Sequence, residues 1–296
     1  MTTVLDAGIA RTLADAGLDA AQVADLVQRT IAEDLNGGVD VTSVATVPPE
    51  QRGVLDLVAR EDGVTCGAWV AAAVFDLVSD HDATVEVRIA DGTNVHAGEV
   101  ILSVRGRTMD LLLGERASLN FLGHLSGIAT ATHAWAVALE GTGARVRDTR
   151  KTTPLLRELE KYAVRCGGGV NHRMSLSDAA LVKDNHIIAA GGVREAFAAV
   201  RDRFPGVPVE IEVDDNAQLR EVLDAGADLV LLDNYDVPAM REAVTINAGR
   251  ARLEASGGLT LDIAHDVGAT GVDYLAVGAL THSARVLDIG ADLRDA

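Results

Sequence analysis

The segments VEIEV (209–213), DLVLLD (228–233) and RLEAS (252–256) decide the predicted fold, because each is a short apolar run of strand type that is followed by a helical pattern. Each ends at or near an acidic residue, and successive acids lie 21 residues apart, the length of one strand, one helix and two short loops. So regular a repeat is typical of the βα units of a parallel barrel. We therefore predict an α/β fold built around a barrel.

Three more short apolar segments continue the pattern: RVRDT (145–149), ALVKD (180–184) and DYLAVG (273–278). The visible units are fewer than those of a complete barrel, so we expect an incomplete one. Active sites of such barrels lie at the carboxyl ends of the strands, which makes the polar residues there the first candidates for chemistry. These residues are Asp148, Lys183, Glu212, Asp233, Glu254 and Ser256.

The first third of the chain has a mixed pattern that predicts a small α+β unit. Helical periodicity covers residues 20–33 and 69–78, and strand-like runs cover 53–60, 84–89 and 99–104. A long uncharged stretch follows at 117–139. Its many polar residues predict a buried helix and not a membrane span, because polar groups are costly in lipid.

Composition narrows the classes of partner. The 296 residues carry a net charge of -18, which repels nucleic-acid phosphates and anionic lipids, so we expect neither as a partner. Cys66 and Cys166 lie 100 positions apart without a C-x-x-C motif, which argues against a disulfide framework and a thiolate zinc site. Charged residues interrupt the N-terminus, so we expect no export signal and a cytoplasmic location.

Cationic side chains are concentrated in one part of this acidic chain. Residues 145–184 contain nine basic and five acidic side chains, and all three lysines of the sequence lie there. A basic segment inside an acidic protein concentrates a small, highly charged anion. Arg157, Lys161 and Arg165 are spaced like one face of a helix, and for these three we expect a solvated surface instead.

Guanidinium groups recognise carboxylates well because they can form two parallel hydrogen bonds. Three arginines are candidates for this role: Arg116, Arg150 and Arg173. On the predicted long helix, the face of Arg116 also carries Asn120, Gly123, His124 and Gly127. Burying such a polar stripe without partners is expensive, so it must face a cavity, a partner subunit or internal hydrogen-bond acceptors, of which we favour the first two.

Two late segments resemble phosphate-binding loops. SGGLT (256–260) and AVGALTH (276–282) each follow a predicted strand and open a predicted helix, where backbone N–H groups and the helix N-terminus can hold an anion. The P-loop, dinucleotide-binding and H-E-x-x-H motifs are absent from the sequence. Asp214 and Asp215 are predicted to cap a helix and not to hold a magnesium pyrophosphate.

Taken together, these motifs resemble the quinolinate phosphoribosyltransferase family over about residues 27–290. The strings that carry the resemblance are DTRKTTP (148–154), NHRMSLSD (171–178), VKDNH (182–186), LEASGG (253–258) and DYLAVGALTHS (273–283). The resemblance implies an N-terminal α/β sandwich over 1–116, on which 283–296 packs back, and an incomplete, seven-stranded α/β barrel over 117–282. It also implies a homodimer or hexamer whose active sites are shared between subunits.

The resemblance implies a role for each matching residue. Quinolinate would be bound by Thr149, Arg150, His172, Arg173, Lys183 and, from the partner chain, Arg116. Lys151, Glu212 and Asp233 would serve the phosphoribosyl pyrophosphate, with Glu212 and Asp233 holding Mg²⁺ directly or through water. Its 5-phosphate would lie on Ser256, Gly257, Gly258, Gly278, Ala279 and His282, and Lys151, Lys183, Glu212 and Asp233 would be catalytic.

The implied reaction yields nicotinate mononucleotide, pyrophosphate and CO₂ in NAD biosynthesis. It needs cationic clamps and electrostatic stabilisation but no protein nucleophile, which agrees with a candidate site that has no Ser-His or Cys-His pair. Two alternatives remain open from the residues alone. One is a barrel aldolase with a Schiff base on Lys183 or Lys151, and the other is a barrel that binds anions without catalysis.

Overall fold

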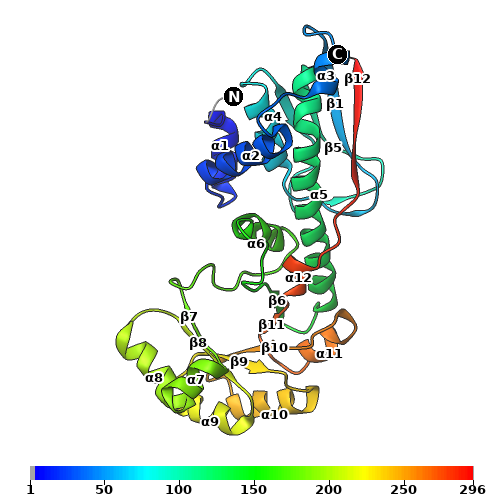
Figure 1. Ribbon diagram of the computed structural model, residues 1–296. Helices are drawn as coiled ribbons and strands as arrows, with labels where there is room; N and C mark the ends of the chain where they lie inside the picture. Colours follow the sequence, from blue (N-terminus) through cyan, green and yellow to red (C-terminus); the bar gives the residue numbers. More distant parts are fainter. Residues whose placement is uncertain (1–3, 296) are drawn as a thin grey trace. The chain divides into compact units, whose positions relative to one another are not determined.

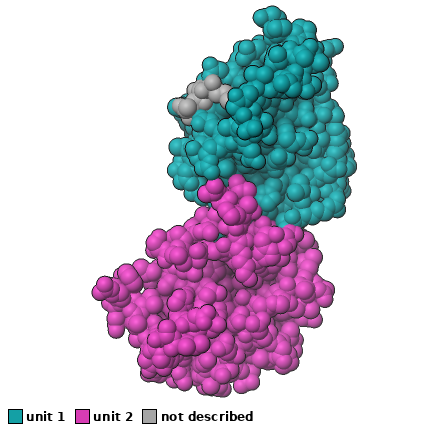
Figure 2. Space-filling view, viewed as in Figure 1, with its two compact units in different colours: residues 1–131, 158–168, 284–296 teal, residues 132–157, 169–283 magenta. Residues whose placement is uncertain are grey.

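The computed structural model describes residues 4–295, which form two compact units (Figure 1). The first unit contains residues 4–131, 158–168 and 284–295 (Figure 2). The second contains residues 132–157 and 169–283. None of the helices between residues 4 and 295 combines the length and the apolar character that crossing a bilayer requires.

A four-stranded antiparallel sheet, in the order β12-β1-β5-β3, forms the centre of the first unit. Its strands are β1 (Arg52–Ala59), β3 (Thr84–Val87), β5 (Val100–Arg107) and β12 (Ile289–Asp295), and a separate ribbon pairs β2 (Gly63–Val64) with β4 (Asn94–Val95). Alternate residues of β1, Leu55, Leu57 and Ala59, enter the hydrophobic core because side chains alternate between the faces of a strand.

Helices surround this core. They are α1 (Ala7–Asp15), α2 (Ala20–Leu35), α3 (Val41–Thr46) and α4 (Ala68–Val78). The first three each begin after an aspartate, Asp6, Asp19 or Asp40, whose carboxylate accepts hydrogen bonds from N–H groups of the first turn. The α4 helix is apolar except for Asp76 and almost entirely buried, with Phe75 in the core. The mixed pattern predicted for this region is confirmed.

The long helix α5 (Thr108–Ala138) begins in the first unit and ends in the second. The expected domain boundary at residue 116 therefore differs from the division at residue 131, because one continuous helix carries the chain past residue 116. The C-terminal segment returns to the first unit, where β12 pairs antiparallel with β1.

Glycines on α5 admit the returning C-terminal segment. A Cβ atom at Gly127 would lie 2.1 Å from the carbonyl oxygen of Arg285, and the N–H of Leu287 donates to the carbonyl of Gly123 (3.0 Å). His124, on the same face, contacts Glu160 through its Nε2 atom (2.9 Å). This part of the predicted polar stripe therefore contacts residues of its own unit, which corrects the expectation of a cavity or a partner subunit. Arg116 and Asn120, on the same face of the helix, remain exposed.

The helix α6 (Arg157–Cys166) corrects the expectation of a solvated cationic face. Lys161 is completely buried, as is Glu160, and only Arg165 of the remaining cations on that face is exposed. Arg165 donates to the carbonyl of Ala16 (2.9 Å). Residues 158–168 belong to the first unit, and Lys161 is shielded from solvent there.

A parallel sheet in the order β6-β11-β10-β9-β8-β7 forms the second unit. Its strands are β6 (Arg145–Arg147), β7 (Ala180–Val182), β8 (Val209–Val213), β9 (Leu229–Asp233), β10 (Arg252–Ser256) and β11 (Tyr274–Ala276). The main helices that alternate with them are α7 (Asp184–Ala190), α8 (Val193–Arg203), α9 (Asn216–Asp224) and α10 (Val237–Asn247). Asp215 caps α9 as predicted.

The sheet is an incomplete barrel, as predicted. Val170 forms a single parallel bridge to Arg147 on the outer side of β6, in the place that a seventh strand would occupy. In the described part of the chain, no strand pairing joins this bridge to β7 at the other edge. The expected seventh strand is thus reduced to one residue, because the glycines 167–169 and the polar loop from Asn171 onward flank it.

Candidate active site

A cavity of about 310 Å³, here called the cationic cavity, lies in the second unit at the carboxyl ends of the strands. Four cationic groups and a histidine surround it, while leucine and alanine side chains supply apolar walls. It is lined by Thr149, Arg150, Lys151, His172, Arg173, Leu181, Lys183, Leu231, Glu254, Ser256 and Ala276. Its composition suits a doubly acidic ring, because the ring can contact the apolar walls while the cations pair with its acids.

A second cavity of about 430 Å³, here called the glycine-rich cavity, adjoins the first. Five residues line both: Thr149, Lys151, Lys183, Ser256 and Ala276. The residues that belong to the second cavity alone include Glu212, Asp233, Asn234, Gly257, Gly258, Gly278, Ala279 and His282. Lys151 and Lys183 therefore stand at the junction of the two cavities, where two ligands bound side by side would meet.

Two arginines of the cationic cavity, Arg150 and Arg173, lie close enough for their charges to repel each other. The Nε atom of Arg150 is buried and has no hydrogen-bond partner anywhere in residues 4–295. Burial and then the nearby charge of Arg150 lower the pKa of Arg173. Two cationic groups that repel each other at a buried site are stabilised by a bound anion. These groups therefore indicate a binding site for carboxylates.

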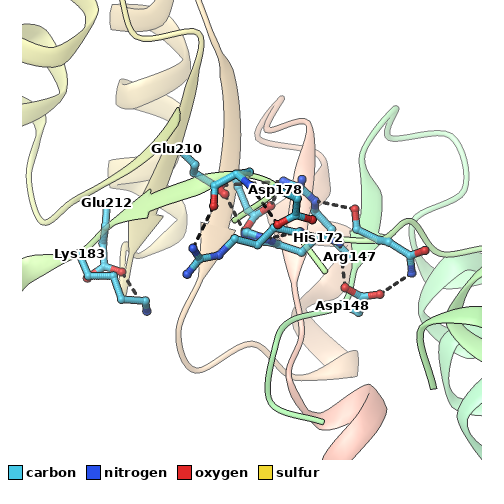
Figure 3. A network of polar contacts seen from close by, with 11 residues as sticks. Arg147, Asp148, His172, Asp178, Lys183, Glu210 and Glu212 are labelled. Atoms are coloured by element: carbon cyan, nitrogen blue, oxygen red, sulfur yellow. Dashed lines mark hydrogen bonds and ion pairs between the residues drawn. The ribbon is translucent and has the colours of Figure 1, made fainter. Parts of the chain in front are cut away.

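A polar cluster in which Arg147 joins the buried residues His172, Glu210 and Glu254 adjoins the cationic cavity. Figure 3 shows Arg147, His172 and Glu210. Arg147 extends from β6 and its Nη1 atom lies 2.7 Å from Glu254 and 3.9 Å from Glu210. The Nε2 atom of His172 lies 2.7 Å from Glu210 and 3.6 Å from Glu254. Its Nδ1 atom accepts a hydrogen bond from the backbone N–H of Arg173 (2.7 Å). The cluster therefore fixes the orientation of the His172 ring beside the cavity.

Two buried carboxylates share the single guanidinium of this cluster. Burial raises the pKa of Glu210 and of Glu254 to about 7, although Arg147 acts in the opposite direction on both. The ligand atoms of His172, Glu210 and Glu254 lie within 4.8 Å of one another, a spacing that a metal ion could use. Arg147 already supplies positive charge there at 2.7 Å, so we assign the cluster as a supporting ion pair and not as a metal centre.

The loop that carries His172 and Arg173 is tied to the end of β6. Asp148 is completely buried and accepts hydrogen bonds from the N–H of His172 (2.8 Å) and from the side chain of Asn171 (2.5 Å). Further along, the Nη1 atom of Arg173 donates to the carbonyl of Ala179 (3.1 Å). Asp148, a strand-end candidate without an assigned task, is thus a positioning residue for the two side chains that follow.

Glu212 and Asp233 stand at the ends of the neighbouring strands β8 and β9. Burial raises the pKa of both, and the charge of Asp233 raises that of Glu212 further. Lys183 lies 3.5 Å from Glu212 (Figure 3). Carboxylate oxygens that repel each other beside a cavity of phosphate size are the donors that Mg²⁺ uses when it binds together with substrate phosphates. The residues present therefore agree with a magnesium site.

The two glycine loops border the glycine-rich cavity. Gly257 has a φ of 89°, and a Cβ atom there would lie 2.1 Å from Oδ1 of Asn234. A Cβ atom at Gly278 would lie 3.0 Å from the side chain of Lys151. The helices that follow are short, α11 (Ala264–Gly268) after a turn and α12 (Ala279–His282), which corrects the expected contribution of helix dipoles. Backbone N–H groups of the loops are what could hold a phosphate here.

Nearly all residues predicted for the site are brought together in these two cavities. The exception is Arg116, which is exposed on α5 in the first unit. Sequence reasoning missed Arg147 and Glu210. The signal for Glu210 was present, because it precedes Glu212 by two positions and so points to the same face of the strand. Arg147 lies in the basic segment 145–184, but nothing in the sequence distinguished it from the other arginines there.

Comparison with known families gives two matches that follow one another along the chain. Residues 40–126 match the model of the quinolinate phosphoribosyl transferase N-terminal domain, and residues 128–292 match that of its C-terminal domain. The carboxylating nicotinate-nucleotide pyrophosphorylase of Mycobacterium leprae is 49% identical over 285 residues, covering 95% of this chain and all of that protein. The decarboxylating quinolinate phosphoribosyltransferase 1 of Nicotiana glauca is 40% identical, covering 89% of this chain and 80% of that one.

Solved structures give the same result for the fold. The crystal structure of NadC from Streptococcus pyogenes superposes with a TM-score of 0.89 at 40% identity, over 93% of this chain and 97% of that one. The nicotinate-nucleotide pyrophosphorylase of Francisella tularensis gives 0.86 at 33% identity, over 92% of this chain and 96% of the other. Both domains, the incomplete barrel and the full-length similarity lead to one conclusion: the chain belongs to the quinolinate phosphoribosyltransferase family.

Proposed function

We propose that this protein converts quinolinate and phosphoribosyl pyrophosphate to nicotinate mononucleotide, pyrophosphate and CO₂, a step of NAD biosynthesis. The observation that carries the proposal is the pairing of two adjoining cavities, one lined by cations and apolar walls and the other by acids and glycines. The first suits a pyridine dicarboxylate and the second a phosphorylated sugar. Membership of the family supports the same assignment.

Quinolinate would occupy the cationic cavity. Arg150 and Arg173 would bind its carboxylates through charge-assisted hydrogen bonds, with Lys183 as a further cation and Thr149 as a hydroxyl donor. His172 would lie against the substrate in the orientation that Glu210 imposes. Arg116 of a second subunit would complete the site, so the assembly would be a homodimer or a hexamer. Its exposure on α5 supports this role.

The phosphoribosyl donor would occupy the glycine-rich cavity. Glu212 and Asp233 would bind the ribose hydroxyls and Mg²⁺, which when bound offsets the charge of the pyrophosphate. Lys151 would contact the leaving pyrophosphate. The 5-phosphate would lie on the loops of Ser256, Gly257, Gly258, Gly278, Ala279 and His282. Thr281 supports this arrangement, because its hydroxyl donates to the carbonyl of Lys151 (2.9 Å).

The geometry would make the two substrates react at the junction of the cavities. Holding the ring nitrogen of quinolinate beside C1 of the sugar replaces a bimolecular encounter by a positioned one, and the negative charge of Glu212 and Asp233 stabilises the cationic sugar that develops. Once the nitrogen is alkylated, the pyridinium ring accepts the electron pair that the 2-carboxylate leaves behind as CO₂. No side chain has to act as a nucleophile.

Release of CO₂ from carboxyl-labelled quinolinate tests the reaction. We expect release only when phosphoribosyl pyrophosphate and Mg²⁺ are both present. Binding of quinolinate without turnover would favour a protein that only binds anions. An adduct on Lys183 after borohydride reduction with a carbonyl sugar, in place of CO₂ release, would favour an aldolase.

Mutation of Arg173 tests the assignment of the cationic cavity. We expect Arg173→Ala to weaken quinolinate binding by about 10- to 150-fold, since a charge-assisted hydrogen bond contributes roughly 1.5 to 3 kcal/mol. Affinity for the phosphoribosyl donor should change little. Arg203→Ala, on the exposed end of α8, is the matched control. Equal quinolinate affinity in the two variants would contradict the assignment.

Mixing inactive variants tests whether sites are shared. Arg116→Ala and Lys183→Ala chains, unfolded and refolded together in equal amounts, should recover up to about a quarter of wild-type activity, because a mixed dimer regains one intact site. No recovery would contradict sharing. A cytoplasmic location belongs to this proposal, and it is supported by the two free thiols.

A further inference from the structure

The two cysteines, 100 positions apart in the sequence, are neighbours in the first unit. Cys66 lies between β2 and α4 and is completely buried, and Cys166 is the last residue of α6 and partly accessible. Both thiols are free. The two side chains lie in each other's immediate surroundings, because the thiol of Cys166 raises the pKa of Cys66 and the thiol of Cys66 lowers that of Cys166.

The backbone around the pair is fixed by short hydrogen bonds. The N–H of Cys66 donates to the hydroxyl of Ser126 (2.9 Å), and that hydroxyl donates back to the carbonyl of Cys66 (3.1 Å). On the other side, Gly92 donates its N–H to Thr65 (2.7 Å) and packs against Cys166, where a Cβ atom would lie 3.3 Å from the Cys166 carbonyl oxygen. The loop before α4 and the end of α6 are therefore held together independently of the thiols.

The two thiols have different environments. Burial raises the pKa of Cys66 well above its ordinary value. The hydrogen bond from Cys66 lowers the pKa of Cys166, and the Tyr162 hydroxyl, which is hydrogen-bonded to Asp91 (2.8 Å), acts in the same direction. A partly exposed thiol with more thiolate character beside a buried second thiol is the arrangement of an attacking and a resolving cysteine.

We propose that Cys66 and Cys166 are a redox modification site that closes to a reversible intramolecular disulfide when the protein meets a peroxide. The thiolate of Cys166 attacks one oxygen of hydrogen peroxide, the O–O bond breaks, and a sulfenic acid and hydroxide form. The sulfur of Cys66 then attacks the sulfur of Cys166, the S–O bond breaks, and the departing hydroxide takes the proton of Cys66. Overall, two thiols are oxidised and one peroxide is reduced to two waters.

Thiol counting on the wild-type protein is the first test. After treatment with hydrogen peroxide and alkylation of the remaining thiols, we expect both cysteines to be lost together. The intact mass should fall by two hydrogen atoms, a peptide linking Cys66 to Cys166 should appear, and dithiothreitol should reverse both changes. Wild-type protein in denaturant is the control, because there the two cysteines should react independently.

Single variants assign the order of events. In Cys66→Ser we expect Cys166 to stop at the sulfenic acid, which dimedone traps. In Cys166→Ser we expect Cys66 to lose its thiol at least about tenfold more slowly than in the wild type, since a buried thiol of raised pKa reacts poorly. Oxidation of wild-type Cys166 to the sulfinic acid while Cys66 stays free would overturn the proposal. So would a disulfide that links only different chains.

Discussion

Replacing Arg147 by Met tests the central ion pair of the second unit. The guanidinium lies 2.7 Å from Glu254 and 3.9 Å from Glu210, its side chain is 15% exposed, and it stacks on the ring of Tyr274 at 4.9 Å. Removing one partner of a buried pair leaves uncompensated charge, which costs roughly 3 to 5 kcal/mol. We expect a loss of this size in the free energy of unfolding at pH 8.

The same substitution should cost less in acid. Without Arg147 the pKa of Glu210 and of Glu254 rises above about 7, because the guanidinium no longer lowers it. Both carboxyls then take up protons as the pH falls, and the unpaired charge disappears. We expect the destabilisation at pH 5.5 to be less than half of that at pH 8.

Urea unfolding followed by tryptophan fluorescence measures this effect. Trp135 is buried in the second unit and Trp69 belongs to the first, so a Trp69→Phe background reports the second unit alone. A loss of 3 to 5 kcal/mol corresponds to a shift of about 2 M in the urea midpoint. Arg145→Met, on the same strand but exposed, is the control and should change stability by less than about 0.5 kcal/mol. Equal losses at both pH values would refute the electrostatic explanation.

Three further predictions follow from the same structure. Gly127→Ala should destabilise the first unit by roughly 1 to 3 kcal/mol, because its Cβ would overlap the Arg285 carbonyl oxygen at 2.1 Å; urea unfolding followed by Trp69 measures it, with exposed Gly38→Ala as control. Gly257→Ala should weaken binding of the phosphoribosyl donor at least about tenfold and leave quinolinate binding unchanged, since it strains a φ of 89° and displaces Asn234. Calorimetric titration with each substrate measures both affinities, and equal losses of affinity for the two substrates would contradict the prediction. Finally, the carboxyls of Glu210 and Glu254 have a pKa raised from 4.5 to about 7, so the folded unit binds more protons than the unfolded chain in that range. Their contribution to stability is therefore complete below pH 4.5 and is lost as the pH rises through about 7. Unfolding of Glu210→Gln and of the wild type across this pH range measures the loss. Two parallel curves of unfolding free energy against pH would contradict it.

The elements of the fold were predictable because their patterns are local. The recurrence of strand-like runs from residue 209 to 256 predicts the parallel sheet, and the cations from Arg150 to Lys183 predict a cationic surface where the structure has the cationic cavity. The long helix and the mixed first unit were also predicted, since alternation and helical periodicity extend over many residues there.

The failures concern contacts between residues far apart in the sequence. Lys161 has the spacing of a surface cation, yet tertiary packing buries it completely. Cys66 and Cys166 become neighbours only through tertiary packing, and their separation of 100 residues in the sequence gives no sign of it. The ion pair of Arg147 with Glu254 joins β6 to β10, strands that are not neighbours in the sheet. Periodicity carries no information about such pairs.

The return of β12 to the edge of β1 sets an order of events during synthesis. All residues of the second unit leave the ribosome before β12 does, so its parallel sheet can form while the earlier sheet still exposes a free edge. Until that last strand arrives, the open edge can pair with another nascent chain. A stop codon shortly before residue 289 should therefore yield aggregates from a chain whose second unit is already complete.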